Sequence, residues 1–126
     1  MQNYKTYQEV LSMNPDDLQF WCDSFLVEIP TSIETIEDMQ LASRLLSQLA
    51  SHFTYLNSLS VYAKNAVRRE KKKGKENKDV YEAMIDRQNA ITSTCDSLKL
   101  LYSCLSRLVT IKQEINKEIN MSNQIH

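Results

Sequence analysis

The longest hydrophobic pattern of the chain runs through residues 39–67. Apolar or small residues recur there at alternating steps of three and four, the heptad spacing of a helix that packs along one seam. No glycine or proline interrupts residues 32–73, so we expect one long helix over 32–73, which Gly74 ends. The seam consists of Met39, Ala42, Leu46, Leu49, Phe53, Leu56, Ser60, Ala63 and Val67.

A second long helix is expected over residues 78–120, followed by a frayed tail at 121–126. A turn at 74–77 is too short for any arrangement but an antiparallel hairpin. Such a hairpin places Val67 near Met84 and Ser60 near Ile91, so the two seams match in register. The second seam consists of Met84, Gln88, Ile91, Cys95, Leu98, Tyr102, Leu105 and Val109.

A shorter helix is expected over residues 15–29. Asn14 is a good N-cap and Pro15 suits the first helical position, while Pro30 stops the helix. The following Thr31-Ser32-Ile33-Glu34 has the spacing of a capping box for the long helix, with Thr35-Ile36-Glu37-Asp38 close behind it. The chain is therefore predicted to be one all-α domain, 1–126, with a short N-terminal helix packed on a coiled-coil-like hairpin. The buried stripe of the short helix would be Leu18, Trp21, Cys22, Phe25 and Ile29.

Both long helices carry more apolar surface than a two-helix seam can cover. The later half of the second helix has an additional strip of leucine and isoleucine, which another polypeptide would have to bury. We therefore expect a homo-oligomer, and an assembly or interaction role with a partner protein. The expected oligomer interface comprises Leu101, Leu108, Ile111 and Ile115.

Positive charge is concentrated at residues 67–78, although the formal net charge of the chain is −1. This segment holds seven basic and two acidic residues, whereas residues 1–66 hold three basic and eight acidic. Cations near a helix C-terminus offset its dipole, so a solvated hairpin end is one interpretation. Contact with an acidic protein is a second, and nucleic-acid binding a third, which the lack of interleaved aromatic residues disfavours. The basic residues are Arg68, Arg69, Lys71, Lys72, Lys73, Lys75 and Lys78.

Tyr55, Tyr62 and Arg69 recur every seven residues beside the seam. They can form a second packing strip in an oligomer. They can alternatively form a recognition surface, where the rings stack on a planar, nucleotide-like ligand and Arg69 meets its phosphate.

Enzymatic function is not expected, and we predict no catalytic residue, cofactor or metal ligand. His52 is interpreted as a residue at the edge of the core, and the other histidine, His126, falls in the tail. The residues needed for a histidine-based catalytic triad or for a metal site are therefore not expected to come together. A chain with one glycine cannot form a phosphate-binding glycine loop. Cys95 and Cys104 are expected to be buried structural thiols.

The expected location is the cytosol. Three cysteines, an odd number without C-x-x-C spacing, suit reduced thiols. The N-terminus leads into no apolar signal region, and no run of 18 apolar residues could span a membrane.

Residues 81–120, with YEAMIDRQNAI followed by LSRLVTIKQEINKEI, resemble short helical accessory proteins of phage and prophage genomes. The basic turn before this segment belongs to the same resemblance. The resemblance implies an accessory factor that binds a protein in the cytosol of a bacterium or a phage-infected host. Some such factors block host defence by binding an enzyme or sequestering a nucleotide signal.

Overall fold

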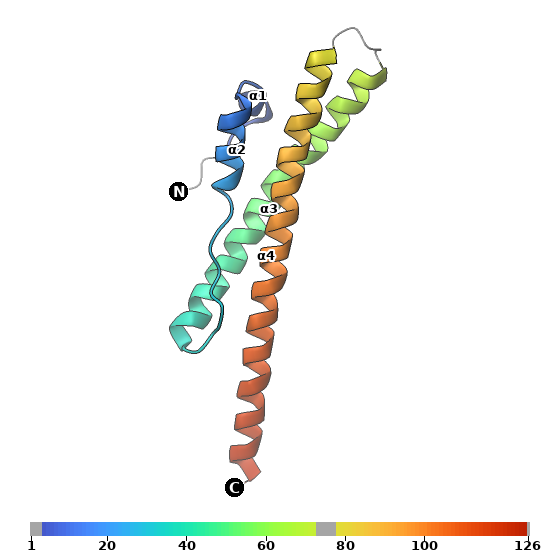
Figure 1. Ribbon diagram of the computed structural model, residues 1–126. Coiled ribbons are helices and arrows are strands. Elements are labelled where there is room, and N and C mark those ends of the chain that lie inside the picture. The colour runs from blue at the N-terminus through green and yellow to red at the C-terminus, as the bar shows by residue number, and fades with distance from the viewer. Residues whose placement is uncertain (1–3, 73–77, 126) are drawn as a thin grey trace.

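The computed structural model describes residues 4–72 and 78–125 and confirms the all-α helical hairpin (Figure 1). Lys73 and the predicted turn at 74–77 lie outside the described residues. Side chains of the last helix are described through Met121. The four helices are α1, Tyr7–Leu11; α2, Pro15–Asp23; α3, Ile36–Lys72; and α4, Lys78–Ile125.

Helices α3 and α4 pack against each other in the predicted register. The Ser60 and Thr92 hydroxyls lie 3.0 Å apart in a hydrogen bond, one residue from the predicted Ser60–Ile91 pairing. Tyr102 is the exception within the predicted seam, because its side chain is 41% exposed. The buried seam residues are Ala42, Leu49, Leu56, Ser60 and Ala63 on α3, and Ile91, Cys95, Leu98 and Leu105 on α4.

Helix α3 begins four residues later than predicted, and of the two stretches named for its start it uses the second, not residues 31–34. The cap is formed by Thr35 and Asp38. The Asp38 N–H donates to the Thr35 hydroxyl at 3.0 Å, while the Asp38 carboxylate accepts the backbone N–H groups of Glu34 and Thr35. These bonds satisfy backbone donors that the first turn leaves unpaired.

Helix α2 begins as predicted with Asn14 as its cap, but it ends at Asp23 instead of residue 29. Residues 26–30 are irregular and lead toward the start of α3. Val27 and Ile29 are β-branched, and a residue before proline is disfavoured in the helical region, so this segment leaves the helix early. The sequence prediction also missed the single-turn helix α1, which Thr6 and Glu9 cap reciprocally.

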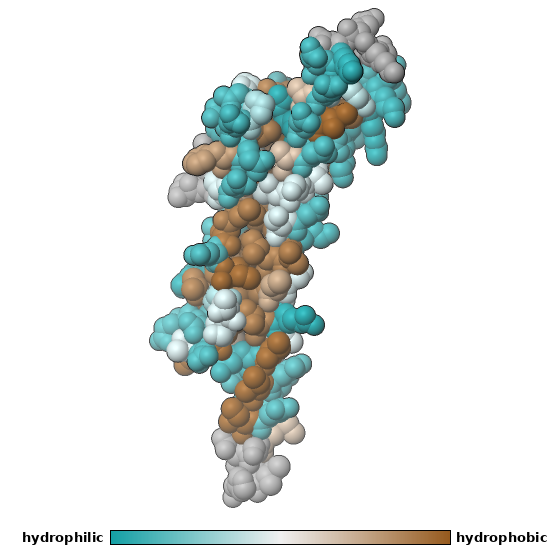
Figure 2. Space-filling view, viewed as in Figure 1, coloured by the Kyte–Doolittle hydropathy of each residue, from teal (hydrophilic) through white to brown (hydrophobic). Residues whose placement is uncertain are grey.

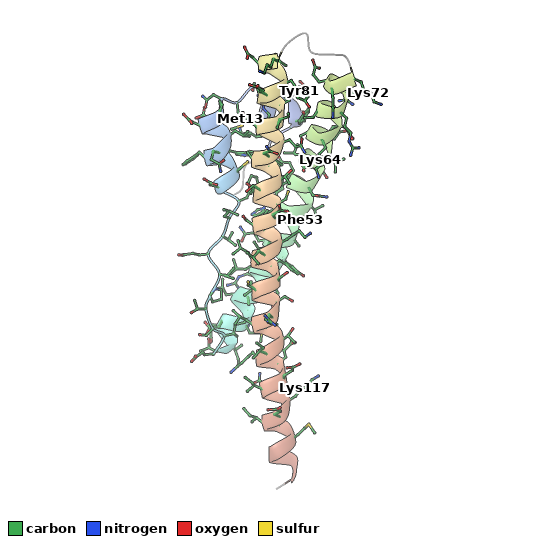
Figure 3. The ribbon with its side chains drawn as sticks, turned by 45° about the vertical axis from the view of Figure 1, so that its right-hand side comes forward. Met13, Phe53, Lys64, Lys72, Tyr81 and Lys117 are labelled. Carbon is green, nitrogen blue, oxygen red and sulfur yellow. The ribbon has the colours of Figure 1, made fainter. Side chains whose placement is uncertain are left out.

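The N-terminal segment lies along the hairpin beside the end where α3 finishes (Figures 1 and 3). We call residues 4–25 the N-terminal clasp. Its buried side chains join those of the two long helices in one hydrophobic core. The clasp contributes Val10, Leu18, Trp21, Cys22 and Phe25 to that core.

Helix α4 continues past the start of α3 and projects from the rest of the molecule (Figure 1). The tail expected to fray from residue 121 is helical through Ile125. Every residue from Gln113 to Met121 is exposed. The projecting end of α4 therefore has no neighbouring element among the described residues.

Candidate interaction surfaces

The projecting end of α4 carries a row of exposed apolar side chains, which we call the distal stripe: Ile111, Ile115 and Ile119. They are 46%, 44% and 52% exposed, respectively, and Met121, which is 63% exposed, lies on another side of the helix. Steps of four residues keep the three isoleucines on one side of a helix. Figure 2 shows this row as a narrow brown strip that continues from the apolar middle of the molecule.

The structure divides the four residues of the predicted oligomer interface into two pairs. Leu101 and Leu108 are half-buried and pack against the chain's own core. Ile111 and Ile115 belong to the distal stripe and lie nearly half exposed. The uncovered surface is therefore closer to the C-terminus than predicted, and its role as an oligomer interface stays a prediction.

The surroundings of the distal stripe carry no strong net charge. Lys112 and Lys117 balance Glu114 and Glu118 along this part of α4. Figure 3 shows Lys117 projecting from α4 with no other helix near it. A shallow depression of about 540 Å³ lies next to Ile111, and only α4 residues line it. The surface is thus a single convex helix face, typical of one that packs against another helix.

The basic end of the hairpin is exposed where it is described. Arg68, Arg69, Lys71 and Lys72 lie on the last turns of α3, where cations favour the negative end of the helix dipole. Lys73 and Lys75 lie outside the described residues. Lys78 contacts Glu82 at 3.9 Å, and both side chains are largely exposed, so this pair contributes at most about 1 kcal/mol. Electrostatic contact with a partner at this end stays a prediction.

Tyr55, the first member of the predicted ligand surface, is half-buried under the clasp. The ring of Tyr4 stacks on it with centroids 4.2 Å apart. Its hydroxyl accepts the Lys5 backbone N–H at 2.6 Å and donates to the Lys5 carbonyl. Burial raises the pKa of Tyr55, opposed by the backbone hydrogen bond from Lys5. The ring and the hydroxyl of Tyr55 are therefore already engaged within the chain.

The other two members of that predicted surface do not gather with Tyr55. Tyr62 is 60% exposed and stacks on Tyr7 with centroids 5.8 Å apart. Arg69 lies two helical turns beyond Tyr62 and is exposed. Tyr55 lines a shallow depression with other residues of α3, to which neither Tyr62 nor Arg69 contributes. A shared site for a nucleotide-like ligand stays a prediction.

His52 lies inside the aromatic cluster that joins the clasp to α3, and only 3% of its surface is exposed. Its Nδ1 is hydrogen-bonded to the Tyr4 hydroxyl at 2.8 Å. Its ring meets Phe25 edge-on with centroids 5.1 Å apart. Within the described part of the chain, Nε2 is buried without a hydrogen-bond partner. Burial lowers the pKa of His52, because desolvation disfavours the imidazolium.

The three thiols divide into two buried and one exposed. Cys104 was predicted to be buried, and this was wrong. It follows Cys95 by nine residues, or two and a half helical turns, and therefore lies on the opposite side of α4. Burial raises the pKa of Cys22, and it raises that of Cys95 to about 11.

Residues 4–72 and 78–125 contain no group of three or more His, Cys, Asp or Glu that could hold a metal ion. In the same residues, no helix is both long and apolar enough to cross a membrane. Neither family models, curated proteins nor solved structures show a match to this chain.

Proposed function

We propose that the chain is a non-enzymatic interaction protein of the phage or prophage accessory type, which binds protein through the distal stripe of α4. The observation that carries this proposal is the projecting end of α4, where Gln113 to Met121 are all exposed. The accessory role rests on the resemblance of residues 81–120 described above. No enzymatic role is proposed.

The residue types at the projecting end of α4 support this proposal. Isoleucine is a weaker helix former than alanine or leucine, so Ile111, Ile115 and Ile119 do not serve helix formation alone. Burying them against a partner would remove apolar surface from water at about 25 cal/mol per Å².

Self-association is the form of binding that we propose for this surface. Two lysines and two glutamates balance one another around the distal stripe, so a second copy meets no large net repulsion. The homo-oligomer predicted from the sequence would then form through Ile111, Ile115 and Ile119 instead of Leu101 and Leu108.

Sedimentation velocity over a wide range of protein concentration tests this assembly. Ile115→Glu places an unpaired carboxylate in the contact, and we expect the association constant to fall about a hundredfold or more. Gln113→Glu is the matched control, because it adds the same charge to the opposite side of the same helix turn. A wild-type chain that stays monomeric at high concentration would contradict self-association, and equal loss in both variants would contradict the role of the stripe.

A further inference from the structure

The clasp is attached to α3 by tyrosine side chains and by one histidine. Tyr4 makes two of these contacts at once, because it stacks on Tyr55 and hydrogen-bonds His52. Within the clasp, its ring also lies against that of Phe25 with centroids 5.8 Å apart. Tyr7 stacks on Tyr62 farther along the same helix. The imidazole of His52 therefore lies at the centre of the aromatic contact between the clasp and α3, while α2 packs on α4.

Only the neutral imidazole suits this position. In either neutral tautomer, Nδ1 can share one proton with the Tyr4 hydroxyl, as donor or as acceptor. The imidazolium has an N–H on both nitrogens, and Nε2 is buried with no acceptor among the described residues. Protonation would thus create a charged, unsatisfied donor in an apolar aromatic cluster, which is costly unless the cluster opens.

We propose that His52 makes the N-terminal clasp an acid-sensitive latch, which closes over α3 when His52 is neutral and opens when His52 takes up a proton. Opening would hydrate the imidazolium and uncover the tyrosines of α3. The hairpin of α3 and α4 would remain, because its seam from Ala42 to Leu105 does not depend on the Tyr4 contact.

The direction of the pH effect follows from proton linkage. The lowered pKa of His52 means that the closed state binds fewer protons than the open state, where the value returns toward 6.5. Closure is therefore fully favoured above pH 6.5 and is weakened as the pH falls below it. The ratio of open to closed clasp should rise about tenfold per pH unit until the lowered native pKa is reached.

The neighbouring titratable groups do not change charge in this window. Tyr55 and Cys22 have raised pKa values, and both lose their protons only in the alkaline range. Glu9 caps α1 and has a pKa below its ordinary value of 4.5, mainly through its hydrogen bonds to Thr6. A transition between pH 5 and 6.5 would therefore report His52 and not these groups.

The single tryptophan gives a direct measurement, since Trp21 lies in the clasp and meets Phe25 and Tyr55 edge-on. We expect the emission of Trp21 in the full chain to shift toward that of a hydrated indole below pH 6.5, while far-UV circular dichroism retains the hairpin signal. His52→Asn is the matched variant, because its amide can bond the Tyr4 hydroxyl but cannot be protonated. Its emission should stay constant over the same range.

Two outcomes would overturn the latch. One is wild-type emission that does not change between pH 5 and 8, and the other is an unchanged acid transition in His52→Asn. Should that variant fail to fold, NMR titration of the wild-type imidazole decides, with His126→Gln to assign the two histidines. A value for His52 below 6.5, with clasp resonances moving at the same pH, supports the latch, whereas a value of 6.5 or above contradicts it.

Discussion

Two parts of α4 have similar periodic patterns but very different surroundings. Between Ile91 and Leu105, the helix buries Ile91, Cys95, Leu98 and Leu105 against α3, and Leu101 is half-buried. Between Gln113 and Met121, it buries none, although isoleucines still recur at steps of four. The difference lies in the neighbours and not in the helix, because α3 begins at Ile36 and cannot follow α4 to its end.

An apolar stripe on a helix therefore shows that this face needs to be buried, but it does not show which element covers it. In the first part of α4, the chain supplies the cover itself through α3 and, in part, the clasp. In the second part, the described residues supply none. The distal stripe is for this reason the surface to which we assign binding.

The largest expected effect comes from truncating one side chain in the packed part of α4 and one in its projecting part. Leu98→Ala removes a completely buried side chain and should lower the free energy of unfolding by about 2–5 kcal/mol. Ile115→Ala, measured at a concentration where the chain is monomeric, should change it by no more than about 0.5 kcal/mol. Urea unfolding followed by circular dichroism measures both values. Similar losses would mean that the distal stripe is buried within one chain.

A second prediction uses the reactivity of the cysteine thiols to distinguish buried from exposed positions on α4. Because the pKa of Cys95 is raised to about 11, its thiolate population at pH 8 is on the order of a hundredfold below that of an ordinary thiol. We expect a thiol reagent to modify one cysteine, Cys104, rapidly in the native chain and all three in denaturant. The rate at Cys95 should rise with pH toward 11. Rapid native modification of two or three thiols would contradict this packing.

The smallest effect concerns the attachment of the clasp. Tyr55→Phe keeps the ring but deletes the hydroxyl that bonds the Lys5 backbone, which should weaken closure by about 1–2 kcal/mol. Hydrogen exchange of α1 amides should then quicken by about tenfold, while α4 amides near Leu98 stay protected. Tyr62→Phe is the control, since its stacking on Tyr7 needs no hydroxyl. Equal acceleration in both variants would show that the effect is not specific to the Tyr55 hydroxyl, and no acceleration in Tyr55→Phe would show that this hydroxyl does not help to close the clasp.

Much of the hairpin could be predicted from the sequence, because a long helix carries its packing face in its own periodicity. The steps of three and four residues predicted α3, α4 and their pairing to within one residue at Ser60. Helix α1 has five residues, too few for a periodic signal. The only indication of it was the spacing of Thr6 and Glu9, which suits a capping box.

The surroundings of the candidate sites could not be predicted in the same way. Tyr55 and Tyr62 have the spacing of an exposed helix face. No sequence pattern near them shows that Tyr4 and Tyr7 pack on their rings. The bond between Tyr4 and His52 joins positions 48 residues apart, so it depends on how the clasp returns to the hairpin. The exposure of Cys104 was different, since its nine-residue separation from Cys95 already placed it on the other side of α4.

The hydroxyl pair of Ser60 and Thr92 has a consequence for how the two long helices find their alignment. A heptad seam repeats itself every seven residues, so sliding α4 by one heptad keeps most apolar contacts. One such slip would bring Ser60 opposite Ile85 and Thr92 opposite Phe53, and both hydroxyls would lose their partner. An unpaired buried hydroxyl costs about 1–3 kcal/mol, and Ser60 is the buried member of the pair, so the loss of this bond penalises a slipped hairpin at Ser60. These two small polar side chains therefore help to select one register among the alternatives that the heptad repeat allows.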